Sequence, residues 1–249
     1  TGLPASILDE RQNLDLAVLQ NFFERRIRGQ PEPIAVLVER VAMIKAGLTD
    51  PTRPQGVFLF VGPTGTGKTE IAKTLAEFLF GSPQRMIRLD MSEFQTPESL
   101  PRLLGGARQG SGRALVDQIR GQPFSVVLLD EFEKAHPNIW DVFLQVFDDG
   151  RLTDWQGNTA DFRHAIIILT SNLGGAVGGP PLGFAEDGGG FSAAAVERAV
   201  ARAFRPEFLN RLDRIVVFHP LTRDTMRGVL RRELEEVFAL ADRLLVLRE

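Results

Sequence analysis

Eight consecutive residues, Gly62-Pro63-Thr64-Gly65-Thr66-Gly67-Lys68-Thr69, match the pattern G-x-x-x-x-G-K-[ST] at every position. The apolar run Val57–Val61 precedes them and an amphipathic stretch, 68–80, follows, so the pattern lies between an expected strand and an expected helix. Backbone N–H groups of such a loop close around phosphate oxygens at a helix N-terminus. We therefore expect a strand–loop–helix unit in which Gly62 to Thr69 bind the phosphates of a nucleotide.

Two side chains of this motif suit the phosphates and their counter-ion. The amine of Lys68 places a positive charge on the β- and γ-phosphates, and the hydroxyl of Thr69 is a ligand for Mg²⁺. Guanine recognition in this class needs an N-K-x-D motif, but none of the four lysines follows an asparagine or a threonine. The expected cofactors are therefore ATP and Mg²⁺.

Short apolar runs alternate with stretches of helical periodicity along the chain, and this alternation predicts an α/β fold. Residues 34–48 have helical spacing, and we expect Pro51 and Pro54 to end that helix. The runs expected to form strands are Val57–Val61, Met86–Asp90, Ser125–Leu129, Ala165–Thr170 and Ile215–Phe218. We predict a five-stranded, mostly parallel sheet, because buried parallel strands are continuously apolar.

The apolar run 126–129 ends in two carboxylates, Asp130 and Glu131. In P-loop hydrolases such a strand holds the metal beside the phosphates, so Asp130 is a candidate for Mg²⁺ binding through water. Glu131 is a candidate general base that polarises the attacking water. An isolated Asp-Glu pair is more often a helix start, but the phosphate-binding motif upstream favours the catalytic interpretation.

Two further kinds of polar residue are candidates for the same site. Asn172 follows the apolar run 166–169, and ligands bind at the carboxyl ends of strands in open α/β sheets, so its amide could orient the water. Arg205 and Arg211 precede the last expected strand, and an arginine finger stabilises charge on a γ-phosphate. A turn asparagine and arginines in surface salt bridges are the alternatives that these residues alone leave open.

Composition argues against several other kinds of site. The chain has no cysteine, which excludes thiolate chemistry, and its three histidines lack the spacing of a metal cluster. With 29 basic and 32 acidic residues the net charge is −3, which disfavours a nucleic-acid partner. No apolar run approaches the roughly 18 residues of a membrane span, and the acidic start differs from a signal peptide. We expect no membrane partner and a cytoplasmic location.

Several longer segments together resemble the second ATPase domain of the Clp (heat-shock-100) unfoldases, which belong to the AAA+ class. The segments that carry the resemblance are 26–30, 58–65, 90–94, Leu128–Pro137, Asp148–Asp154, Thr170-Ser171-Asn172 and Arg205–Arg211. Their order and spacing cover nearly the whole chain, so the resemblance is far more specific than any single motif.

The resemblance implies an activity, partners and residue roles. ATP hydrolysis would drive the unfolding or remodelling of protein substrates by a homo-hexameric ring. Asn172 would be the first sensor, and Arg211 would be the finger that reaches the next subunit. Ile27 and Arg28 would lie on the adenine side of the nucleotide.

The resemblance also divides the chain. Residues 1–30 would be a linker and the adenine-side segment, 31–220 the large α/β subdomain, and 221–249 the start of a small helical subdomain. The family continues with the rest of that subdomain, which carries a second sensor arginine in a Gly-Ala-Arg motif. Gly106-Ala107-Arg108 has this sequence but precedes the expected strand that ends in Asp130, so we reject it as that sensor.

The segment between Arg102 and Leu115 departs from the family pattern. The family carries a glycine- and tyrosine-rich loop there whose aromatic side chain grips the substrate, whereas this segment has no aromatic residue and the chain has no tyrosine. An alternative function is therefore an ATP-dependent regulatory or scaffold module that does not thread polypeptide. A DNA-handling motor ranks third because of the acidic charge balance.

Leu182-Gly183-Phe184 fits the aliphatic-glycine-hydrophobic tripeptide of peptidase-coupled family members. One interpretation is docking to a Clp-type peptidase. The plainer one is a hydrophobic anchor for the glycine-rich stretch 174–190.

Overall fold

The computed structural model describes residues 15–105, 114–174 and 192–246. Two predicted features, Gly106-Ala107-Arg108 and Leu182-Gly183-Phe184, lie outside these residues, as do the first 14 residues of the predicted linker. The described helices are α2 (Leu16–Arg26), α3 (Pro31–Lys45), α4 (Lys68–Phe80), α5 (Leu100–Leu104), α6 (Leu115–Gly121), α7 (Pro137–Asp149), α8 (Ala193–Ala203), α9 (Pro206–Leu209) and α10 (Arg223–Val246).

Five strands form one sheet in which every neighbouring pair is parallel. They are β1 (Gly56–Val61), β2 (Met86–Asp90), β3 (Val126–Asp130), β6 (Ile166–Ser171) and β7 (Arg214–Val217), in the order β2-β3-β6-β1-β7. The predicted five-stranded α/β fold is confirmed. Each strand end lies within one residue of its expected position.

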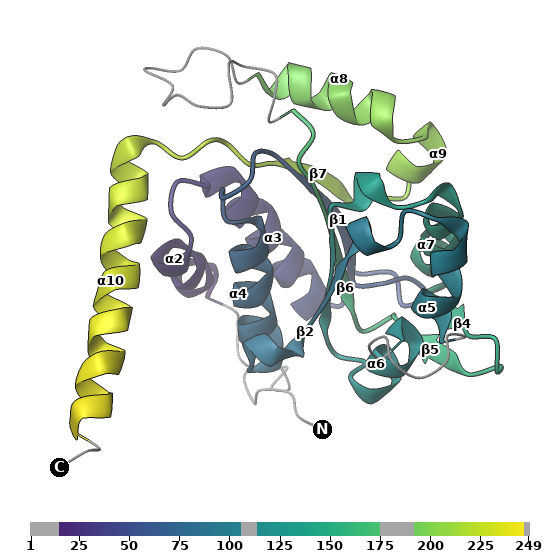
Figure 1. Ribbon diagram of the computed structural model, residues 1–249, viewed down its shortest axis with the longest axis horizontal. Helices are drawn as coiled ribbons and strands as arrows, with labels where there is room; N and C mark the ends of the chain where they lie inside the picture. Colours follow the sequence, from purple (N-terminus) through teal and green to yellow (C-terminus); the bar gives the residue numbers. More distant parts are fainter. Residues whose placement is uncertain (1–14, 106–113, 175–191, 247–249) are drawn as a thin grey trace.

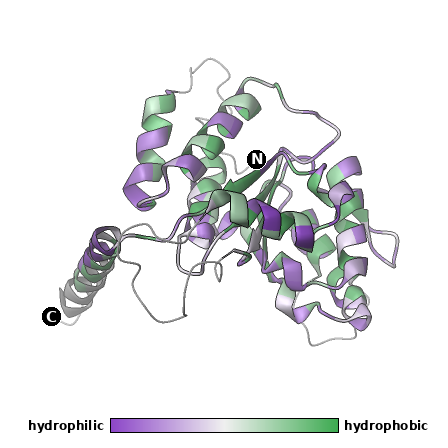
Figure 2. Cartoon of the chain, turned by 90° about the horizontal axis from the view of Figure 1, so that it is seen from above, coloured by the Kyte–Doolittle hydropathy of each residue, from purple (hydrophilic) through white to green (hydrophobic). Residues whose placement is uncertain are grey.

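The sheet separates two hydrophobic cores. Successive residues of a strand point to opposite faces, so Val57, Leu59 and Val61 pack in one core while Phe58 and Phe60 pack in the other. Helices α2, α3 and α4 cover one face and α5 to α9 the other (Figure 1). Figure 2 shows the strands as an apolar centre between helices that are polar on one side. The result is a three-layer unit with the carboxyl ends of all five strands at one edge.

Helix α3 ends well before Pro51, so the expectation that prolines end it is wrong. Gly47 has a left-handed φ of 66°, and the N–H of Leu48 donates to the carbonyl of Met43. Glycine ends helices in this way because it adopts a left-handed conformation without steric cost. As a result Leu48, expected on the apolar face of the helix, is 70% exposed.

The hairpin of β4 (Arg151–Thr153) and β5 (Thr159–Asp161) has no counterpart among the expected strands. Each of its strands has three residues and buries one apolar side chain, Leu152 or Ala160. A pattern this short carries no detectable period, which is why the sequence did not indicate it.

Helix α10 stands beside α2, outside the three layers (Figure 1). Among its described side chains, four apolar ones at intervals of four residues are exposed: Met226, Leu230, Leu234 and Phe238. Among the described helices, including this long one, none is long and apolar enough to cross a membrane.

Candidate nucleotide-binding site

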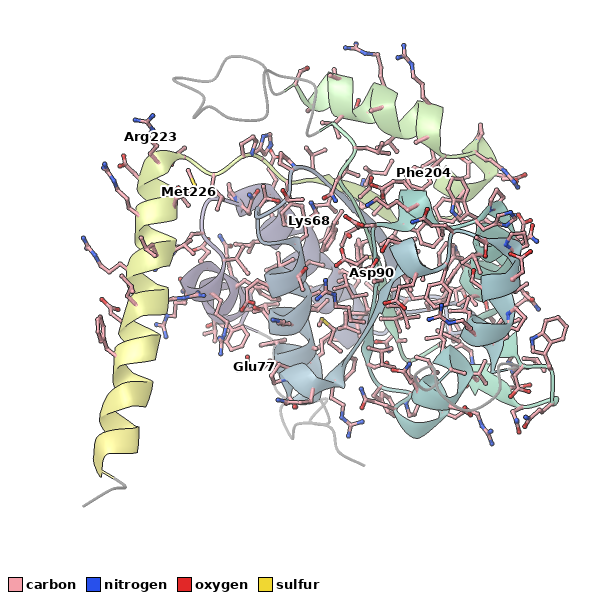
Figure 3. The ribbon with its side chains drawn as sticks, viewed as in Figure 1. Lys68, Glu77, Asp90, Phe204, Arg223 and Met226 are labelled. Atoms are coloured by element: carbon pink, nitrogen blue, oxygen red, sulfur yellow. The ribbon has the colours of Figure 1, made fainter. Side chains whose placement is uncertain are left out.

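A cavity of about 480 Å³ opens at the carboxyl edge of the sheet. The loop between β1 and α4 and the ends of β2, β3 and β6 line it, through Thr64, Gly65, Thr66, Gly67, Lys68, Thr69, Glu70, Arg88, Asp90, Asp130, Glu131 and Asn172. Figure 3 shows Lys68 at the first turn of α4, next to the sheet. The structure therefore brings most of the predicted phosphate-binding, metal-binding and catalytic side chains into one cavity.

The loop between β1 and α4 turns sharply at glycines. A Cβ on Gly62 would lie 2.4 Å from the carbonyl oxygen of Phe218, so only glycine fits there. Gly67 has a φ of 98° and precedes α4 without a side-chain cap. The first N–H groups of α4 are consequently available to an anion, which the helix dipole also favours.

Lys68 is 7% exposed, and its ammonium group lies inside the loop. It donates hydrogen bonds to the carbonyls of Gly62 at 2.5 Å and Pro63 at 2.8 Å, and to Oδ1 of Asn172 at 3.1 Å. Burial lowers the pKa of Lys68 to about 8, although the carboxylates of Asp130, Glu133 and Glu131 partly offset that effect. The amine thus remains largely charged at pH 7 and is oriented before any phosphate binds.

Asp130 ends β3 and is held from two sides. The hydroxyl of Thr170, on the neighbouring strand β6, donates to its Oδ1. The guanidinium of Arg88, on the other neighbour β2, donates to its Oδ2 at 2.6 Å. This pairing follows from the strand order, because β3 lies between β2 and β6. The Asp130 carboxylate therefore has a defined position, and it lines the same cavity as Thr69.

Glu131 has a left-handed backbone with φ of 55°, the only such non-glycine residue in the described part of the chain. Its N–H donates to Oγ1 of Thr170 at 3.1 Å, which ties this conformation to β6. Its carboxylate accepts from Nδ2 of Asn172 at 2.9 Å and from Nζ of Lys134 at 2.7 Å. Strained backbone of this kind concentrates at functional sites, where the surroundings enforce it.

Asn172 connects the two halves of the cavity. Its side chain accepts from Lys68 on the loop side and donates to Glu131 on the strand side. Its own N–H donates to Oε1 of Glu133 at 3.0 Å. Glu133 lies in η4 (Phe132–Lys134), the short helix that begins directly after Glu131. One short segment therefore supplies both carboxylates that Asn172 contacts, Glu131 through its side-chain amide and Glu133 through its backbone N–H.

Five predicted site residues do not line the cavity: Ile27, Arg28, Gly62, Pro63 and Arg211. Gly62 and Pro63 belong to the loop itself, and their carbonyls accept hydrogen bonds from Lys68. Ile27 is 4% exposed and packs in the core beneath α2, and Arg28 is exposed at the surface. Arg211 follows α9, where its Nε donates to Asp148 at 2.7 Å. The guanidinium of Arg53 donates to the carbonyl of Arg211 at 3.1 Å, which fixes the backbone there. The adenine-side and finger roles of these residues remain predictions.

The sequence reasoning missed Arg88, Thr170 and Glu133. Thr170 stands two residues before Asn172, and Arg88 stands two residues before the end of β2. The rule that selected Asn172, that polar side chains at strand ends face the ligand edge, would have found Thr170. It would not have found Arg88, which is the central residue of β2. No comparable signal marks Glu133, because its partner is the backbone N–H of Asn172, just beyond β6 and far away in the sequence.

A family model described as AAA domain (Cdc48 subfamily) matches residues 53–215. The chain belongs to this family. The match begins before β1 and ends within β7, so it contains β1, β2, β3 and β6 completely, the start of β7 and all the cavity residues.

Curated relatives of this AAA domain are chaperones. Chaperone protein ClpB of Meiothermus ruber is 46% identical over 245 residues, which is 95% of this chain and 28% of that protein. Chaperone protein ClpB of Corynebacterium efficiens is 43% identical over 253 residues, 100% of this chain and 28% of that protein. The chain therefore spans little more than a quarter of the curated relatives it matches.

A solved structure titled as the closed state of Hsp104 with ATPγS and FITC casein superposes on the AAA domain with a TM-score of 0.79 and 38% identity. The superposition covers 95% of this chain and 41% of that one. The predicted resemblance to Clp and heat-shock-100 ATPase domains is confirmed, and with it the use of a nucleotide.

Proposed function

We propose that the chain is an ATP-hydrolysing module that drives the unfolding or remodelling of protein substrates. The observation that carries the proposal is the position of Glu131, whose carboxylate Asn172 holds at the edge of the phosphate-binding loop. A general base acts on water only within hydrogen-bond reach, so a carboxylate fixed at the γ-phosphate side of such a loop suits hydrolysis.

The residues at the cavity fit a magnesium ion. Mg²⁺ prefers oxygen ligands and takes one or two protein groups together with phosphate oxygens and waters. Thr69 and Asp130 offer a hydroxyl and a carboxylate at the same cavity. Magnesium bound there would neutralise charge on the β- and γ-phosphates during transfer.

The remaining roles belong to side chains of the chain itself. Lys68 binds the phosphates with an ammonium group that the loop carbonyls already orient. Glu131 accepts a proton from the attacking water, and Asn172 holds both Lys68 and Glu131 in place. This preorganisation lowers the barrier, because the groups need not reorient during the reaction.

We also propose that the module acts in a homo-hexameric ring in which Arg211 reaches the nucleotide of the next subunit. Arg211 lies outside the cavity of its own chain, and its side chain is about one-third exposed, at 35%. To act on a γ-phosphate, Arg211 would therefore have to reach the nucleotide of a neighbour, which is a common arrangement in phosphoryl transfer. Protein substrates are proposed because the relatives are chaperones and one solved neighbour was captured with casein.

The test is phosphate release by the purified chain with and without casein, over a series of protein concentrations that reveals ring assembly. We expect turnover that rises with concentration and is stimulated by casein. The matched control is Glu131→Gln, which should bind ATP but release phosphate at least about 100-fold more slowly. Turnover that casein does not stimulate at any concentration would instead favour a nucleotide-dependent scaffold.

A further inference from the structure

Gln30 connects the phosphate-binding loop to the segment that leads into α10. Its side chain is 1% exposed. Its Nε2 donates to the carbonyl of Thr66 at 3.2 Å and to the carbonyl of His219 at 2.8 Å, and its Oε1 accepts from the N–H of His219 at 3.1 Å. Both amide hydrogens are therefore used, and they join backbone groups that lie far apart in the sequence.

The same segment contacts the loop a second time. The N–H of Phe218 donates to the carbonyl of Val61 at 2.7 Å, and the Phe218 carbonyl oxygen lies 2.4 Å from the position that a Cβ of Gly62 would take. Residues 218 and 219 thus touch the loop at its beginning, at Gly62, and through Gln30 at Thr66. In a close-packed region a displacement of this loop has to shift these residues as well.

Helix α10 is attached to the residues just before Gln30. Nη1 of Arg232 donates to the carbonyl of Arg26 at 2.7 Å. A Cβ on Gly29 would lie 3.0 Å from the side chain of Thr225, so the first turn of α10 packs closely against Gly29. Figure 3 shows Arg223 and Met226 at this first turn. Residues 218–222 connect it to β7.

We propose that Gln30 transmits the nucleotide state of the phosphate-binding loop to the orientation of α10. A loop that closes on phosphate moves the Thr66 carbonyl, and the shared Nε2 of Gln30 passes that shift to His219 and the start of α10. Gln30 is a positioning residue in this scheme, since it touches backbone groups of the site and no reacting atom. The proposal rests on the proposed function, because it requires nucleotide at the loop.

The experiment measures the distance between the sheet body and α10 by spin labels. The chain has no cysteine, so Asp117→Cys on α6 and Arg231→Cys on α10 can be labelled without a background. Both positions are exposed and outside the cavity. We expect the distance distribution to differ between the ADP-bound and ATPγS-bound chain.

Two substitutions at Gln30 test its role. Gln30→Met removes all three hydrogen bonds, and Gln30→Glu keeps an acceptor for His219 but loses both donors. In each we expect the two distance distributions to coincide while nucleotide affinity stays within about tenfold of the unsubstituted chain. The matched control is Gln122→Met, which removes a glutamine hydrogen bond to the Gln84 carbonyl and should leave the nucleotide-dependent shift intact.

A glutamine that only stabilises the fold would lower the melting temperature and leave the shift unchanged, and that result would overturn the proposal. So would identical distributions in the unsubstituted chain with nucleotide demonstrably bound. Failure of that chain to bind nucleotide would overturn the proposed function instead.

Hydrogen exchange of the His219 amide in the chain without substitutions gives a readout that does not depend on a variant folding. It should differ between the ADP and ATPγS states, and equal exchange would contradict the coupling.

Discussion

Nδ2 of Asn172 donates a 2.9 Å hydrogen bond to the Glu131 carboxylate while Oδ1 of the same amide accepts from Lys68. One side chain therefore orients the proposed base and the phosphate-binding cation together. An amide suits this position because it offers a donor on one side and an acceptor on the other.

Replacing Asn172 with aspartate should separate these two functions. Asn172→Asp keeps an acceptor for Lys68 but sets a negative charge against Glu131. We expect kcat to fall about 100-fold because the base is displaced, with little change in nucleotide affinity. Steady-state phosphate release and a fluorescent-nucleotide titration measure the two quantities. An equal loss of affinity and kcat would contradict this division of roles.

The Thr170 hydroxyl should be needed to position both acidic residues, because it donates to the carboxylate of Asp130 and accepts from the backbone N–H of Glu131. In Thr170→Val the Glu131 N–H and Asp130 Oδ1 each lose a partner, and a buried polar group without one costs roughly 1–3 kcal/mol. We expect a lower free energy of unfolding in urea and slower hydrolysis. Thr170→Ser is the matched control, since it keeps the hydroxyl, and it should retain most of the activity. If valine were tolerated as well as serine, the hydroxyl would have no such role.

Nucleotide affinity should fall as the pH rises through about 8. Burial lowers the pKa of Lys68 to about 8, and a bound polyphosphate favours the charged amine, so the complex takes up a proton above this pH. Affinity should be flat below about pH 7 and weaken by up to about tenfold per pH unit above 8. Calorimetry between pH 6.5 and 9.5 gives the profile. Lys68→Met should bind weakly without this slope, and a flat profile for the chain with Lys68 would refute the assignment.

Alanine should be far more harmful at Gly62 than at Gly65, although both glycines belong to the same loop. The Gly62 Cβ would collide with the Phe218 carbonyl, whereas a Cβ on Gly65 meets nothing within 4 Å. We expect Gly62→Ala to cost roughly 3 kcal/mol of stability, from overlap and strain together. Gly65→Ala has only its φ of 75° to overcome, about 1 kcal/mol. Urea unfolding compares the two, and equal costs would mean that the loop relaxes away from Phe218.

Local signals predicted most of the fold. Helix α4 begins and ends where expected, since the G-K-T motif marks its start and Gly81 its end. The central strands β1, β3 and β6 were the most predictable, because each contains a continuous buried apolar run. The sequence did not show that α3 ends at a glycine, or that a short hairpin exists, because those features depend on one left-handed residue and on tertiary burial.

The site was predictable where function follows from a contiguous motif and not where it follows from contacts between distant segments. Asp130, Glu131 and Asn172 stand at the carboxyl end of a strand or just beyond it, and the loop after β1 brings Lys68 to the same edge of the sheet. Gln30 joins backbone groups at 66 and 219, and no spacing rule connects these positions. Ile27 and Arg28 belong to a matching segment, but their side chains do not line the cavity.

The left-handed backbone of Glu131 has a consequence for directed evolution. A side chain in this region costs on the order of 1 kcal/mol that glycine would not incur. A library of variants selected for heat resistance alone should therefore accumulate Glu131→Gly, and the survivors would outlast the parent while consuming no ATP. At this residue a change that raises thermal stability abolishes ATP turnover. Only a selection that demands both properties would keep the glutamate.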